Sequence, residues 1–221
     1  MKGRETLYVD PECPDQNTMG KAAALIKKED LVVFPTSSFY GLGADALNVR
    51  AVDKVFQAKK RDPRKPVLIL IASLADLAPL VQSIPPTATP LIEAFWPGDL
   101  TLVFHAADIL PSNLSGHTGK IGIRLAGHPV ASALVKAVGS PVTGTSANLS
   151  GKGACTAVEH LDLPIRDQVA LVLDAGRLAG GKGSTVVDVT ADFPKILRQG
   201  AIDAEEIWTA LNPRDVDLCT L

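Results

Sequence analysis

Cysteine is scarce in this chain. Among its 221 residues there are three, Cys13, Cys155 and Cys219, and no two of them form a C-x-x-C pair. Such an odd, widely spaced set argues against a disulfide framework or a zinc site and is typical of a reducing compartment. The histidines are equally scattered, and they give neither H-E-x-x-H nor a Ser/His/Asp order. The sequence therefore predicts no metal centre built from protein ligands.

Long hydrophobic runs and a strong net charge are also missing. No apolar run approaches the roughly 20 residues that cross a membrane, and the start MKGRETLYVD lacks the apolar core of a signal peptide. The net charge of −2 argues against a protein that coats nucleic acid, although a local basic site stays open. We therefore expect a cytoplasmic protein without a membrane partner.

What the chain does contain is an alternation of helical and strand patterns. Helices are expected at residues 18–28, 50–60, 128–139 and 203–212, with shorter ones at 77–83 and 89–96. Apolar strands are expected at 31–35, 67–72, 100–106, 121–126, 141–147, 170–176, 184–190 and 195–202. Because several strands follow one another without a helix, we predict an α/β fold with a mixed sheet flanked by helices. No linker divides the pattern, so we expect one domain over 1–211 and a loose tail over 212–221.

Positive charge is concentrated in KKRDPRK, residues 59–65, where five of seven residues are basic. Pro63 and Pro66 restrict the backbone, so the cations would be held in place. A solvated loop and an anion clamp are both open. In the second case Lys59 and Arg61 would converge on a phosphate or carboxylate where the helix ends.

Two arginines lie within apolar strand patterns, Arg124 in IGIRLA and Arg198 in KILRQG. A buried charge costs several kcal/mol unless it is paired or bound by a ligand. Both a structural ion pair and an anion site remain open for each. Together with the basic loop, however, they indicate a concave site for an anionic ligand at the strand ends.

Small hydroxyl residues follow two of the expected strands. FPTSSFYGLG, residues 34–43, is either a chain-reversing turn or a ligand loop, with Gly41 and Gly43 letting the chain pass closely. VTGTSANLSG, residues 142–151, is either a polar turn or a ligand edge, with Ser146, Asn148 and Ser150 on one side.

Seven segments in order resemble the YrdC/TsaC-like threonylcarbamoyl-AMP synthases: FPTSSFYGLGADA, AKKRDPRKPV, WPGDLTLV, IGIRLAGHP, TSANLSG, STVVDVT and ILRQGAI. The resemblance extends from about Gly20 to Ala210. It implies the short, single-domain form and a twisted α/β sheet with a large, positively lined concave face. It also implies an enzyme that makes threonylcarbamoyl-AMP and pyrophosphate from L-threonine, bicarbonate or CO2, and ATP. Mg2+ would accompany the ATP, and a transferase complex would move the threonylcarbamoyl group onto tRNA.

The resemblance also assigns roles by motif position. The K-x-R pair falls on Lys59 and Arg61, which are expected to be catalytic. The expected nucleotide contacts are Lys59, Arg61, Lys65, Ser146, Asn148 and Arg198. The expected L-threonine contacts are Thr36, Ser38, Arg124 and Ser184.

The chain departs from the family pattern at Ser37, Asp62, Leu70, Asp99 and Ala154. Other readings remain open beside the synthase. The same basic face could bind RNA, or the chain could be a paralogue that handles another carbamoyl or acyl adenylate, or an inactive structural partner.

Overall fold

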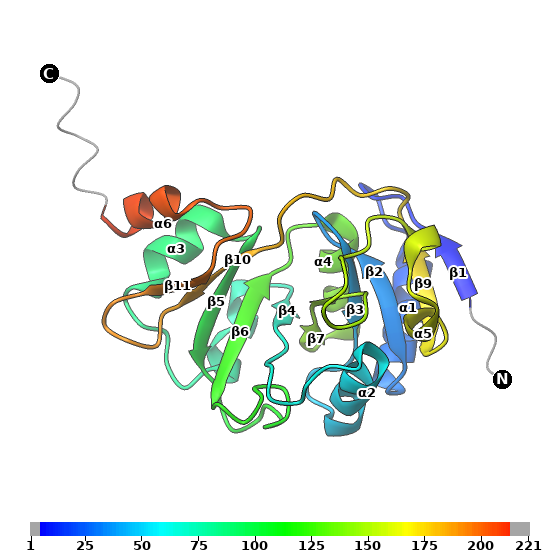
Figure 1. Ribbon diagram of the computed structural model, residues 1–221, viewed down its shortest axis with the longest axis horizontal. Coiled ribbons are helices and arrows are strands. Elements are labelled where there is room, and N and C mark those ends of the chain that lie inside the picture. The colour runs from blue at the N-terminus through cyan, green and yellow to red at the C-terminus, as the bar shows by residue number, and fades with distance from the viewer. Residues whose placement is uncertain (1–4, 213–221) are drawn as a thin grey trace, which may run out of the picture.

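A computed structural model describes residues 5–212, and the expected tail lies, beyond Asn212, outside the described residues. Its strands form two hydrogen-bonded sheets that lie side by side (Figure 1). Each sheet contains both parallel and antiparallel pairs, and helices flank both. The predicted fold class, a mixed α/β fold with flanking helices, is confirmed.

The first sheet has five strands in the order β1 (Glu5–Tyr8), β9 (Val169–Asp174), β2 (Leu31–Pro35), β3 (Tyr40–Gly43) and β8 (Thr145–Ser146). Val32 and Phe34 pack in one core cluster with residues of α1 (Gln16–Lys27) and α4 (Pro129–Val138). Leu31 and Val33 pack with residues of α2 (Val49–Lys59) and α5 (Leu163–Arg166). Because both faces are covered, every residue of β2 is buried, which explains its unbroken apolar run.

The second sheet has six strands in the order β11 (Lys195–Arg198), β10 (Thr185–Asp188), β5 (Leu100–His105), β6 (Lys120–Leu125), β4 (Ile69–Ile71) and β7 (Val142–Thr143). One face packs against α3 (Ala88–Phe95) and α6 (Ala204–Leu211). Short 3-10 turns lie at Leu74–Asp76, Ala78–Leu80 and Val158–His160. The second stands in place of the helix expected over 77–83, so that expectation is wrong.

Side-chain alternation separates the two faces of the second sheet. In β6, Ile121 and Ile123 are fully buried in the core. Gly122 and Arg124 point to the opposite face, which borders a cavity. This period of two places polar residues of otherwise apolar strands on one surface.

The strand expected over 141–147 is divided between the sheets, so the expectation of one continuous strand there is wrong. β7 belongs to the second sheet and β8 to the first, with Gly144 between them. A Cβ at Gly144 would lie 2.6 Å from Cδ1 of Leu68 and 2.8 Å from Cγ of Leu70. Only a residue without a side chain fits where the chain crosses between the sheets.

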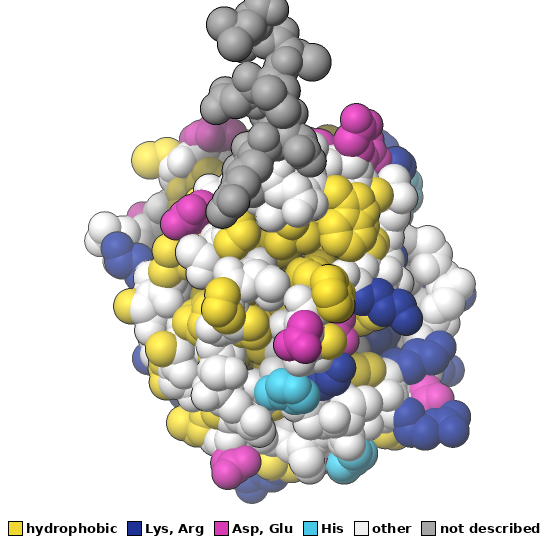
Figure 2. Space-filling view, turned by 90° about the vertical axis from the view of Figure 1, so that its left-hand side faces the viewer, with side chains coloured by type: hydrophobic (Ala, Val, Ile, Leu, Met, Phe, Trp, Pro, Cys, Tyr) yellow, Lys and Arg dark blue, Asp and Glu magenta, His cyan; other side chains and the backbone are white. Residues whose placement is uncertain are grey.

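Figure 2 shows the end of the molecule that carries α3, α6 and β11, where apolar side chains gather and basic ones lie along one side. The exposed large hydrophobic residues from this part of the chain include Phe193, Leu197 and Trp208. Within residues 5–212, no helix is long and apolar enough to cross a membrane.

Candidate functional site

A cavity of about 770 Å3 lies between the two sheets. Its lining combines an apolar part, including Val67, Leu68, Leu70, Val103 and Val186, with charged side chains. The cations that border it are Arg61, Lys120, Arg124, Lys182 and Arg198, whereas Asp188 is its one carboxylate among the described residues. This excess of positive charge suits an anionic ligand.

The turn between β2 and β3 forms part of the wall and contributes Thr36 and Ser38 to the lining. The Thr36 hydroxyl donates to the Phe39 carbonyl at 2.6 Å, which closes the turn. The carbonyl of Ser38 accepts from the Gly180 amide at 3.0 Å. The segment is therefore both a chain-reversing hairpin and a cavity wall.

The glycines that follow this turn lie in a strand and make room for a buried ring. Gly41 and Gly43 belong to β3, paired with β2, and a Cβ would lie 3.1 Å from the Phe34 ring on Gly41 and 2.9 Å from it on Gly43. Gly41 also lines the cavity, so the chain does pass close to the site there, as an extended strand and not as a bend.

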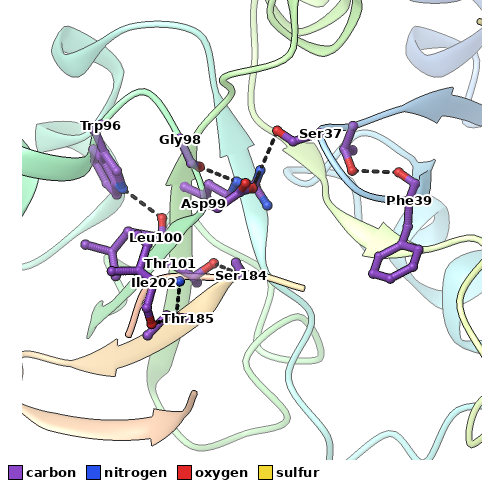
Figure 3. A network of polar contacts seen from close by, with 12 residues as sticks. Ser37, Phe39, Trp96, Gly98, Asp99, Leu100, Thr101, Ser184, Thr185 and Ile202 are labelled. Atoms are coloured by element: carbon purple, nitrogen blue, oxygen red, sulfur yellow. Dashed lines mark hydrogen bonds and ion pairs between the residues drawn. The ribbon is translucent and has the colours of Figure 1, made fainter. Parts of the chain in front are cut away.

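Arg124 comes from the cavity face of β6, and three residues hold its guanidinium (Figure 3). Its Nε donates to the Gly98 carbonyl at 2.6 Å, and its Nη2 pairs with the Asp99 carboxylate. Nη2 also donates to the Ser37 hydroxyl at 3.4 Å, across the gap between the sheets. Burial and the charge of Arg198 lower the pKa of Arg124, while Asp99 opposes the shift. The sequence left an ion pair and an anion site open, and the structure shows an ion pair at the edge of a cavity.

Ser184, the residue before β10, contacts β5 and β11. Figure 3 shows its contact with Thr101 of β5. The Ser184 hydroxyl lies 2.9 Å from that of Thr101 and accepts from Arg198 Nη2 at 3.0 Å. Arg198 also donates to the Ser184 carbonyl, from Nη2 at 2.6 Å and from Nε at 3.1 Å. Beside it, the Thr185 hydroxyl donates to the Ile202 carbonyl at 2.6 Å. Arg198 and Ser184, assigned to different substrates by the resemblance, are therefore direct neighbours.

The K-x-R pair is separated by the end of helix α2. Lys59 is its last residue, and Lys60 takes a left-handed conformation with φ of 48°. Arg61 then lines the cavity, donating to the carbonyls of Lys65 at 3.1 Å and Pro66 at 2.8 Å. Burial lowers the pKa of Arg61.

Lys59 points elsewhere and is only 1% exposed. Its ammonium donates to the Ser146 carbonyl and, at 2.7 Å, to the Asn148 carbonyl. Burial, with a smaller effect of Arg61, lowers the pKa of Lys59 to about 8. Lys59 and Arg61 therefore do not converge on one point of the cavity, and in this structure Lys59 holds the segment after β8.

Two other expected nucleotide contacts lie outside the cavity lining. Lys65 is exposed, and Asn148 is 6% exposed in a turn that begins where β8 ends. Asn148 donates to the carbonyls of Leu149 and Lys152 at 2.8 and 2.7 Å. Ser146 does line the cavity, so the expected shared side of Ser146, Asn148 and Ser150 is wrong. Contacts of Lys59, Lys65 and Asn148 with a nucleotide stay predictions.

Lys120 and Asp188 are cavity residues that the sequence analysis missed. Lys120 Nζ lies 2.9 Å from Asp188 Oδ2, across the cavity face of the second sheet. Burial raises the pKa of Asp188, but hydrogen bonds from Thr190 and Lys120 outweigh it and leave that pKa below its usual value. The signal was available: Lys120 lies four residues before Arg124 and Asp188 four after Ser184, each on the same strand face.

These features define a class: an α/β protein with an arginine-rich cavity between two mixed sheets. A sequence profile described as "Telomere recombination", that of the Sua5/YciO/YrdC family, matches residues 24–200. The chain belongs to this family, which confirms the resemblance read from its motifs.

Three named proteins of known or assigned kind are similar to this chain. A threonylcarbamoyl-AMP synthase of Bacillus subtilis is 38% identical over 200 residues, which are 90% of this chain and 58% of that protein. A putative threonylcarbamoyl-AMP synthase of Mycobacterium tuberculosis is 40% identical over 90% of this chain and 92% of its own length. The crystal structure of P. abyssi Sua5 complexed with L-threonine superposes with a TM-score of 0.88 at 34% identity, covering 95% of this chain and 61% of that one. The chain thus spans less than two thirds of the B. subtilis and P. abyssi proteins.

Proposed function

We propose that this chain is a threonylcarbamoyl-AMP synthase. It would convert L-threonine, bicarbonate or CO2, and ATP into threonylcarbamoyl-AMP and pyrophosphate. The observation that carries the proposal is the cavity itself, where Arg61, Arg124 and Arg198 border one space together with Thr36, Ser38 and Ser184. Similarity to proteins named threonylcarbamoyl-AMP synthase, and to a Sua5 structure with L-threonine, supports this choice of substrates.

The chemistry fits such a lining. Attack of a threonine carbamate on the α-phosphorus of ATP needs alignment and neutralised oxygens more than a strong base. Arg61 would supply fixed positive charge to the phosphates, and Arg198 with Ser146 would hold the nucleotide. Arg124, Ser184, Thr36 and Ser38 would bind L-threonine.

Mg2+ would enter with ATP. Among residues 5–212 no group of three or more His, Cys, Asp and Glu side chains is arranged to hold a metal ion. Asp188 is already engaged by Lys120 and Thr190. The Mg2+ ion would be coordinated by the nucleotide phosphates and water, and it would neutralise charge on the polyphosphate.

The proposed product would need a partner that consumes it. A threonylcarbamoyl transferase complex would take the adenylate and modify tRNA, and ATP and L-threonine as substrates are consistent with the cytoplasm. RNA binding at the same basic cavity, or another carbamoyl or acyl adenylate as product, are the competing functions.

Pyrophosphate release tests the proposal. With ATP, bicarbonate and Mg2+ present, we expect release on adding L-threonine and much less with L-serine, glycine or no amino acid. Equal release with all of them would reject threonine as the substrate. No release, combined with RNA binding that weakens steeply with salt, would favour the RNA-binding function.

A further inference from the structure

Asp99 lies outside the cavity lining, yet its carboxylate pairs with Arg124, which borders the cavity. The turn between α3 and β5 thereby presents two acceptors to one guanidinium. The Gly98 carbonyl accepts from Nε, and the Asp99 carboxylate accepts from Nη2. Adjacent residues thus engage one edge of a rigid, planar fork of donors.

This turn is itself anchored by both neighbouring strands. The Gly98 amide donates to the Leu125 carbonyl of β6 at 3.3 Å, and the Asp99 carbonyl accepts from the Thr185 amide of β10 at 3.0 Å. A Cβ on Gly127 would lie 3.1 Å from the Gly98 Cα, so the chain packs closely there as well. The position of the two acceptors is therefore set by the backbone.

The arrangement leaves one part of the guanidinium available. Within residues 5–212, Nη1 of Arg124 has no hydrogen-bond partner, while Nε and Nη2 are both engaged. The Asp99 charge also offsets part of the positive charge that Arg124 and Arg198 bring to this end of the cavity. Asp99 therefore affects both the direction of a donor and the local field.

We propose that Asp99 is a positioning residue that aims Nη1 of Arg124 at one carboxylate oxygen of an amino-acid ligand and limits the attraction of the cavity for polyanions. The identity of the ligand rests on the proposed function, whereas the effects on Arg124 and on the field do not. An amino acid is a zwitterion without net charge, so it depends on the directed donor. Pyrophosphate carries several negative charges, so it responds chiefly to the field.

Two substitutions separate these effects. Asp99→Ala removes both the charge and the acceptor, and Asp99→Asn removes the charge but keeps an amide oxygen for Nη2. Glu93→Gln on the exposed side of α3 is the matched control for Asp99→Asn, because it also replaces a carboxylate by an amide but lies outside the cavity lining. Circular dichroism and thermal unfolding verify that each variant folds.

We expect Asp99→Ala to raise the KM for L-threonine about tenfold and Asp99→Asn to raise it less, because orientation is worth roughly this much at a directed contact. We expect inorganic pyrophosphate, measured by calorimetry without substrates, to bind several-fold more tightly to both variants. A loss of fold would weaken the binding of both ligands, so weaker L-threonine binding with tighter pyrophosphate binding has another cause. If the KM for L-threonine and the dissociation constant of pyrophosphate change in the same direction, or neither changes, the proposal is wrong.

A second measurement keeps the inference independent of the proposed reaction. The Arg124 Nε–H resonance, assigned by its loss in Arg124→Lys, should exchange with solvent faster in Asp99→Ala and remain unchanged in Glu93→Gln. If the unaltered protein releases no pyrophosphate with L-threonine, the synthase proposal fails, but this resonance and the pyrophosphate affinity still decide the role of Asp99. An unchanged resonance in Asp99→Ala would overturn it.

Discussion

At the scale of single residues, the arginines of the cavity differ in how strongly they are held. Arg124 has a carboxylate partner, and Arg198 donates hydrogen bonds to the carbonyl and hydroxyl of Ser184. Arg61 is oriented by two carbonyls, and the charge of neighbouring Asp62 offsets only part of the effect of burial on its pKa. It therefore brings a positioned positive charge to the cavity, which suits a contact with phosphate.

Replacing Arg61 by alanine should therefore reduce kcat/KM for pyrophosphate release by the equivalent of about 2–4 kcal/mol, the usual effect of losing one charge-assisted transition-state contact. The variant should stay folded, because Arg61 is not part of a hydrophobic core cluster. Steady-state kinetics check this prediction. Arg64→Ala is the control, since Arg64 is exposed, pairs with Asp62 and does not line the cavity. Equal losses in both variants would contradict a specific role of Arg61.

Residue roles could be predicted only where a local pattern decides them. An arginine within a strand of alternating burial lies on the face away from the core, and this correctly predicted the placement of Arg124. The direction of Lys59 depends instead on how α2 packs beside the segment after β8, which no local pattern contains. The position of Asn148, buried and outside the cavity lining, follows in the same way from that turn.

At the scale of elements, helix α4 shows how one side chain can define a boundary. His128 is its N-cap: Nδ1 accepts from the Val130 amide at 3.2 Å, and Pro129 is the first helical residue. A cap of this kind satisfies one of the amides left unpaired at a helix start. His128 thus has a structural role at the start of α4, as its place before a proline suggests.

The cap makes the stability of α4 sensitive to pH. Burial lowers the pKa of His128 from 6.5, although Glu12 opposes the shift. The unfolded chain therefore takes up the proton more readily than the folded one, so the free energy of unfolding is full above pH 6.5 and falls as the pH drops below it. His128→Asn keeps a capping oxygen without titrating, and it should lose less stability on acidification than the unaltered protein.

Urea unfolding over this range measures both effects. His128→Ala should lower the free energy of unfolding by about 1 kcal/mol at neutral pH, the usual cost of a lost cap. If His128→Asn followed the same pH curve as the unaltered protein, the titrating group would be a different one.

Elements were predicted where they are long enough to show a period. The patterns of α2, α4, β5 and β6 are of this kind. Strands β7 and β8 have two residues each, too few to show alternation, and they exist because neighbouring strands supply partners. Strand β3 is not among the expected strands, because its two glycines weaken the strand pattern; the reason for them is the ring of Phe34.

At the scale of the whole molecule, the two sheets create the site. One apolar cluster packs the second sheet against α3 and α6, and another joins strands of both sheets with α1 and α4. The face of the second sheet that carries Gly122 and Arg124 borders the cavity. The wall opposite comes from the β2–β3 turn and from Ser146. Composition and strand patterns predicted an anionic-ligand site, but not that it would lie between two sheets, because strand pairing is decided by long-range contacts.

In the proposed reaction this cavity joins threonine, bicarbonate and the AMP part of ATP into one product. Mass spectrometry after incubation with ATP, L-threonine, Mg2+ and isotopically labelled bicarbonate tests it most directly. We predict threonylcarbamoyl-AMP whose mass increases by one unit when the bicarbonate carbon is labelled, formed in amounts equal to the pyrophosphate released. Pyrophosphate release accompanied by an adenylate without the label, or by no adenylate, would rule out the proposed reaction.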